Sequence, residues 1–91
     1  MTAPYHPPVK RSVVIEGHRT SISLEPVFWD RLRNAAQAEG LSVNSLIARI
    51  DRERIAAATP PGLASAVRIW VLQHAPIRKE APDVTSDASI T

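Results

Sequence analysis

Two periods of apolar side chains follow one another along the chain and predict a strand followed by helices. In residues 19–24, RTSISL, polar and apolar side chains alternate, which is the period of a β-strand. The polar face comprises Arg19, Ser21 and Ser23, and the apolar face comprises Thr20, Ile22 and Leu24. A lone strand with one apolar face is not stable in water. We therefore expect this strand to pair with a second strand and to pack on helices.

The second strand is expected to come from another copy of the chain, because no convincing strand follows residue 24. A hairpin within the chain is the alternative. Residues 12–15 have high β preference, and residues 16–18 can turn the chain back toward residues 19–24. The choice bears on function, because a two-stranded ribbon fits a DNA major groove more easily than a wider sheet.

The first predicted helix begins near Pro26, since proline fits the first helical position, and ends at Gly40. Its apolar stripe comprises Val27, Phe28, Leu32, Ala35 and Ala36. Trp29 lies off this stripe, and we expect it to cover the edge of a subunit interface. Ser42 is the predicted N-cap of the second helix. The apolar positions of that helix are Val43, Leu46, Ile47 and Ile50.

A third helix is predicted over residues 63–75, after a break at residues 59–62. It is apolar on nearly every side, with one stripe at Leu63, Val67, Trp70 and Val71. Ile69 and Leu72 lie off this stripe. We expect the helix to pack against the second helix and to widen a dimer core. A surface that binds a partner protein would show the same pattern.

The chain is divided into four parts on these patterns. Residues 1–17 form a flexible N-terminal arm, with a short strand at 12–15 as the open alternative. Residues 18–58 hold the strand and two helices, residues 59–75 a linker and the third helix, and residues 76–91 a disordered tail.

Composition is typical of one small domain, with 91 residues of which 44% are hydrophobic. Few aromatic side chains are available for the core, which favours dimerisation. The chain has no cysteine, no signal segment and no apolar run of about 20 residues, so we expect a cytoplasmic protein that does not enter a membrane. A net charge of +2 allows a nucleic-acid partner without requiring one.

Residues for catalysis or metal binding are not brought together by the sequence. His6, His18 and His74 lie far apart, and the three glycines are separated. No Ser/His/Asp arrangement can be assigned. We therefore expect no enzyme activity, no cofactor and no metal.

The segment RTSISLEP, the first helix and the segment GLSVNSLI at residues 40–47 resemble the ribbon-helix-helix family of DNA-binding proteins, typified by the Arc and methionine repressors. The longer segment from 12 to 29 and the third helix also resemble a bacterial subfamily of poorly defined function. The resemblance implies a mainly α ribbon-helix-helix homodimer with an intersubunit antiparallel β-ribbon and an additional C-terminal helix. It further implies a repressor-like bacterial transcription regulator, associated with the nucleoid in the cytoplasm.

Site residues follow from the same resemblance. It implies that Arg19, Ser21 and Ser23 contact bases of double-stranded DNA. Arg19 would carry most of the discrimination, because arginine can bind guanine with two hydrogen bonds. The expected phosphate contacts are Ser42, Val43 and Asn44 at the start of the second helix, together with Lys10, Arg11 and His18. Glu16 and Glu25 flank the strand with a charge that repels DNA, so the affinity is expected to be modest.

The alternative is an antitoxin-like or adaptor module that binds proteins. In that case the helix at residues 63–75 would hold a protein partner, and the polar strand face would be structural only.

Overall fold

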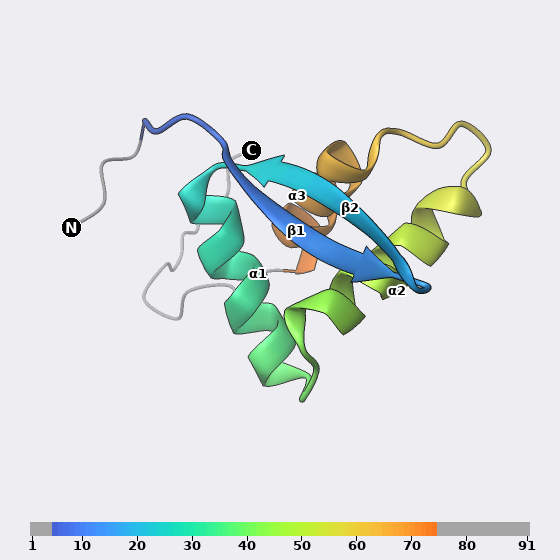
Figure 1. Cartoon of the computed structure of the whole chain (residues 1–91), viewed down its shortest axis with the longest axis horizontal. Coiled ribbons are helices and arrows are strands. Elements are labelled where there is room, and N and C mark those ends of the chain that lie inside the picture. Colours follow the sequence, from blue (N-terminus) through green and yellow to red (C-terminus); the bar gives the residue numbers. More distant parts are fainter. Residues whose placement is uncertain (1–4, 75–91) are drawn as a thin grey trace, which may run out of the picture.

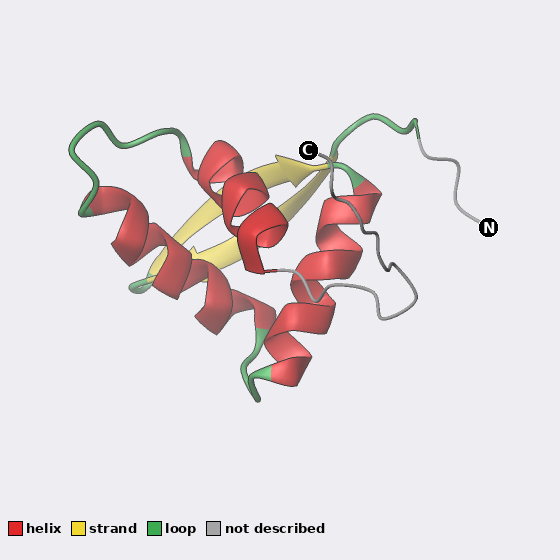
Figure 2. Ribbon diagram, turned by 180° about the vertical axis from the view of Figure 1, so that it is seen from behind, coloured by secondary structure: helices red, strands yellow, loops and turns green. Residues whose placement is uncertain are grey.

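A computed structural model of the chain describes residues 5–74, and these form a hairpin followed by three helices. The strands are β1 (Val9–Ile15) and β2 (His18–Leu24), and the helices are α1 (Pro26–Ala38), α2 (Val43–Ile55) and α3 (Leu63–His74). All three helices lie on one face of the hairpin, and the opposite face is uncovered (Figure 1). Figure 2 shows the same layers from the helical side. The tail predicted at residues 76–91 lies outside the described residues.

The hairpin pairs β1 with β2 in antiparallel register, from Val9 opposite Leu24 to Ile15 opposite His18. Glu16 and Gly17 form the turn with φ values of 53° and 80°. Positive φ at both central residues is the signature of the two-residue turn whose twist matches a hairpin. The hairpin left open by the sequence is thus the arrangement within the chain, and β1 begins earlier than residue 12. The intersubunit ribbon stays a prediction.

The inner face of the hairpin packs on the helices. Residues that face each other across an antiparallel pair share one side of the sheet. On the inner side, Val13, Ile15, Ile22 and Leu24 are each at most 9% exposed. The apolar face predicted for residues 19–24 is therefore confirmed at Ile22 and Leu24. Val13 and Ile15 of β1 add two more buried side chains to the same side of the hairpin.

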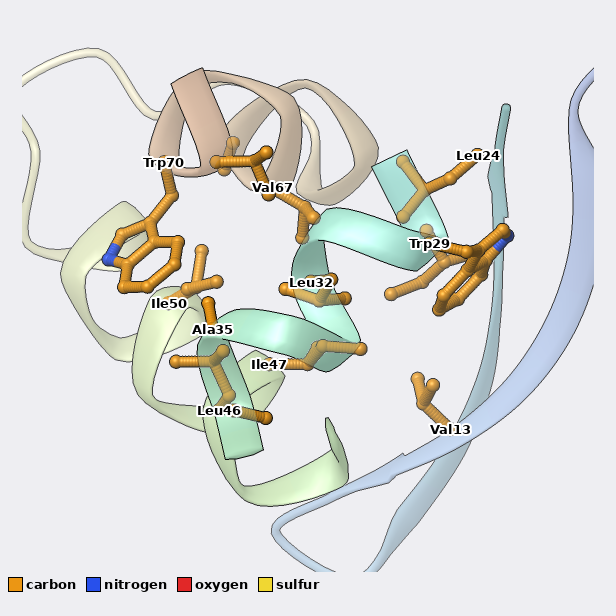
Figure 3. Close-up of a cluster of buried hydrophobic side chains, with 14 of the residues drawn as sticks. Val13, Leu24, Trp29, Leu32, Ala35, Leu46, Ile47, Ile50, Val67 and Trp70 are labelled. Carbon is orange, nitrogen blue, oxygen red and sulfur yellow. The ribbon is translucent and has the colours of Figure 1, made fainter. Parts of the chain in front are cut away.

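The helices bury most of the stripes that their sequences predicted, but Val27 is 49% exposed, and Phe28, Val43 and Leu63 are half-buried. Figure 3 shows side chains from α1, α2 and α3 meeting in one core. The buried helical residues are Trp29, Leu32, Ala35, Ala36, Leu46, Ile47, Ile50, Ala66, Val67, Trp70 and Val71. Ile69 and Leu72, which lie off the stripe of α3, are 49% and 74% exposed. None of the described helices combines the length and the apolar character that crossing a membrane requires.

Trp29 corrects one expectation. The sequence placed it at the edge of a subunit interface, but it is only 3% exposed and lies inside the core of its own chain. Its indole Nε1–H donates to the carbonyl oxygen of Val9 over 2.9 Å. The guanidinium of Arg11 lies 5.4 Å from the centre of the ring. Because β1 pairs within the chain, it covers Trp29, which leaves this side chain no place at a subunit interface.

Arg68 joins α3 to the junction between β2 and α1. Its Nε–H donates to Glu25 Oε1 over 3.0 Å, and its Nη2–H donates to the carbonyl oxygen of Ser23 over 3.4 Å. The hydrogen bond from Arg68, followed by the one from the backbone N–H of Glu25, holds the pKa of the Glu25 carboxyl below its ordinary value of 4.5.

Acid should weaken this link between α3 and the hairpin. A carboxyl with a lowered pKa in the folded chain stabilises that chain above the unfolded pKa, and the stabilisation is lost as the pH falls through the folded value. Glu25→Gln should therefore remove part of the stability difference between about pH 7 and about pH 3, measured by urea unfolding. Glu53→Gln, on the exposed side of α2, is the control. The same acid dependence in Glu25→Gln and the wild type would contradict the expectation.

Candidate nucleic-acid interface

The side of the hairpin away from the helices carries six side chains, which we call the outer face. Lys10 faces Ser23, Ser12 faces Ser21, and Val14 faces Arg19. Ser23 is half-buried and the other five are exposed. The three predicted base contacts, Arg19, Ser21 and Ser23, therefore lie together on one surface. Directly beside them lie Lys10, Ser12 and Val14 of β1, which were not predicted to contact bases.

The outer face has the width and charge of a surface for a DNA groove. Adjacent strands lie about 4.8 Å apart, so a hairpin is narrower than the major groove, which is about 12 Å wide. A cation stands at each end of the face, Arg19 beside the turn and Lys10 at the open end. The two flanking carboxylates have cationic partners, since Glu16 lies 3.6 Å from Arg52 and Glu25 binds Arg68.

The three phosphate contacts predicted in the hairpin lie on different faces, because successive side chains of a strand point to opposite sides of the sheet. Lys10 lies on the outer face with the predicted base contacts. Arg11 points to the opposite side, over the ring of Trp29. His18 is also on the inner side, opposite Ile15, at the end of the hairpin that holds the turn. The structure thus brings Lys10 to the predicted base contacts but not His18.

The start of α2 lies against the edge of β1. Ser42 Oγ accepts from the backbone N–H of Ser45 over 3.0 Å, which confirms the predicted N-cap. Asn44 Oδ1 accepts from the backbone N–H of Val14 over 3.4 Å. Because Val14 belongs to the outer face, this hydrogen bond fixes the start of α2 beside that face.

A cleft of about 280 Å³ separates the start of α2 from β1 and α1. Its lining consists of Arg11, Ser12, Val13, Trp29, Arg33, Ser42, Val43 and Asn44. The amides and the dipole at the start of a helix favour an anion, and the two arginines add positive charge. Asp30 pairs with Arg33 and offsets part of that charge. The cleft adjoins the outer face, because Ser12 belongs to both.

Arg33 lines the cleft, although its position in the sequence did not predict a place in the site. Helical periodicity places it on the wet side of α1, and nothing local distinguishes it from other exposed arginines there. Only the packing of α1 beside the start of α2 brings it to the cleft. Within residues 5–74, no group of three or more His, Cys, Asp or Glu side chains is placed to hold a metal ion.

Comparison with known proteins identifies the family. The family model described as "Ribbon-helix-helix domain" matches residues 8–75, which is well over half of the chain and includes both strands and all three helices. No curated protein and no solved structure matches the chain. Domains of this kind are typical of DNA-binding transcription regulators and of antitoxins. With its hairpin, its capped second helix and the matched range, the chain belongs to the ribbon-helix-helix domain family.

Proposed function

We propose that this protein is a sequence-specific DNA-binding transcription regulator, of repressor type, that places the outer face of its β-ribbon in the major groove. One observation carries the proposal. The hairpin presents a polar, exposed face with a cation at each end, and the helices leave that face uncovered (Figure 1). A two-stranded ribbon is one of the structures that a major groove admits.

In this function Arg19 is the main base contact. Its guanidinium can donate two hydrogen bonds to O6 and N7 of guanine. Ser21 lies at the centre of the outer face, and its hydroxyl can donate to or accept from several bases. Ser23 is half-buried, and Arg68 binds its carbonyl oxygen, so we assign it the smaller part.

Phosphate contacts position the ribbon in the groove. We assign this role to the start of α2, at Ser42, Val43 and Asn44, with Arg11 beside it. The cleft adjoins the outer face, as a site for the phosphate backbone along the groove must. Lys10 and His18 are the other proposed phosphate contacts, and only Lys10 lies on the outer face.

We propose a homodimer in the bacterial cytoplasm, acting without a cofactor. Two pairings of the strands are compatible with a homodimer. The β2 strands of two protomers pair with each other, as the sequence predicted, or each protomer uses the hairpin described above.

Selection of duplexes from a random pool, followed by sequencing, tests DNA reading directly. The wild-type chain should enrich one motif and bind it with higher affinity than a scrambled duplex. Ser21→Glu should abolish this preference, because it places a negative charge at the centre of the outer face. Ser65→Glu, which adds the same charge on the exposed side of α3, should leave the preference unchanged. Circular dichroism of both variants checks that they fold.

The antitoxin-like or adaptor function is the second candidate, and exposed apolar side chains favour it. Leu72 is 74% exposed and Val27 is 49% exposed. Both line a groove between α1 and α3, with Phe28, Arg31 and Val71. A random pool that yields no enriched duplex would favour this function over DNA reading.

A further inference from the structure

The two strands of the hairpin carry related sequences. Residues 10–15 are KRSVVI, and residues 19–24 are RTSISL. At an offset of nine positions, a cation matches a cation and a serine matches a serine. Two inward apolar residues match as well, Val13 with Ile22 and Ile15 with Leu24. The resemblance therefore extends over both the outer and the inner face.

The pairing of the strands turns this repeat into an approximate twofold symmetry. Ser12 faces Ser21 at the middle of the outer face. In an antiparallel pair, a twofold axis that passes between two facing residues, perpendicular to the sheet, exchanges positions equally far along each strand. This axis exchanges Lys10 with Arg19 and Val14 with Ser23. Each strand thus presents a cation, a serine and a small side chain in the same order.

We propose that β1 takes the place of a partner subunit's strand, so that one protomer carries a complete reading ribbon. On this basis Lys10, Ser12 and Val14 contact bases together with Arg19, Ser21 and Ser23, and Lys10 takes this role in place of the phosphate contact proposed above. The inference rests on the proposed DNA-binding function and names additional residues for it. Lysine can bind guanine, serine suits several bases, and an aliphatic side chain can contact the methyl group of thymine.

The edges of the hairpin support a ribbon of two strands. At the edge of β1, Asn44 binds the backbone N–H of Val14, and at the edge of β2, Arg68 binds the carbonyl oxygen of Ser23. A further strand would have to displace one of these side chains. Pairing two hairpins edge to edge would also place the outermost strands about 14 Å apart, which exceeds the width of about 12 Å of the major groove.

The recognised DNA element should then be a short, imperfect inverted repeat. The outer face extends from the pair Lys10 and Ser23 to the pair Val14 and Arg19, a length of about 13 Å, or about four base-pair steps. Arg19 would govern one half of the element and Lys10 the other. In an intersubunit β2 ribbon, by contrast, the two copies of Arg19 would govern both halves equally.

Cysteine crosslinking tests the pairing without DNA, because the native chain has no cysteine. Facing residues in antiparallel strands have Cα atoms about 4.5–5.5 Å apart, which suits a disulfide. Ser12→Cys with Ser21→Cys, oxidised by glutathione disulfide at low protein concentration, should crosslink within one chain and run as a monomer on a non-reducing gel. Ser21→Cys alone should give no covalent dimer. A covalent dimer from either variant, or no crosslink in the double variant, would overturn the inference.

Duplex selection with Lys10→Ala and Arg19→Ala tests whether each of these two residues governs one half of the DNA element. Each variant should lose base preference in one half and keep it in the other. Loss of both halves in Arg19→Ala, with no change in Lys10→Ala, would show an intersubunit ribbon and overturn the inference. If the wild type selects no motif although the crosslink forms within the chain, the DNA-binding function fails together with its base contacts, while the intrachain pairing stands.

Discussion

Replacing Trp29 with alanine should lower the free energy of unfolding by about 3–5 kcal/mol. The side chain is 3% exposed and packs between α1 and the hairpin, so its removal leaves a large cavity. It also leaves the carbonyl oxygen of Val9 without the indole N–H that binds it. A small domain has a total stability of about 5–15 kcal/mol, so the variant would be folded only marginally.

Urea unfolding followed by far-ultraviolet circular dichroism measures this loss. Trp29→Phe is the informative companion, because it fills most of the cavity and removes the hydrogen bond to Val9, which contributes about 1 kcal/mol. Ile55→Ala serves as the control, since Ile55 is 60% exposed and its truncation should change stability little. If Trp29→Ala were no less stable than Ile55→Ala, the packing of α1 against β1 described above would be wrong.

Replacing Arg19 with alanine should weaken binding to the selected duplex by about 5-fold to 150-fold. This range corresponds to about 1–3 kcal/mol for one bidentate contact between arginine and guanine. Discrimination at the contacted base pair should fall by the same factor, while binding to a scrambled duplex should fall only slightly. Fluorescence anisotropy at one fixed salt concentration measures both quantities, because affinity for DNA depends steeply on salt.

Arg31→Ala is the matched control for Arg19→Ala. Arg31 is exposed on α1 and lines the groove toward α3, on the helical side of the hairpin. Both variants remove one positive charge, so the difference between them isolates the contribution of the base contact. An equal loss of affinity in the two variants would count against base contact by Arg19.

Local signals were sufficient to predict the helices. Pro26 and Gly40 bracket α1, and Ser42 caps α2, because each of these residues acts on backbone groups within one or two turns of itself. The spacing of apolar residues also distinguished the buried stripe of α3 from Ile69 and Leu72. These features depend on neighbours in sequence, which is why one sequence was enough to find them.

The pairing of strands could not be settled in the same way. Residues 12–15 showed β preference, but whether they pair with residues 19–24 of the same chain depends on the turn at Glu16 and Gly17 and on the surface that Trp29 offers to β1. The position of Lys10 beside Ser23 follows only once that register is known. Arg33 gave no local sign of its neighbours at the start of α2.

The loop between the two strands also sets which chemistry meets the solvent. With two residues in the turn, Ser12 faces Ser21 and the serines point away from the helices. A slip of β1 by one residue against β2 would exchange the two faces of β1, so that aliphatic groups would point outward and Lys10 would point toward the core. The register that this tip fixes therefore decides whether the ribbon presents hydroxyl and ammonium groups or bare hydrocarbon to its surroundings.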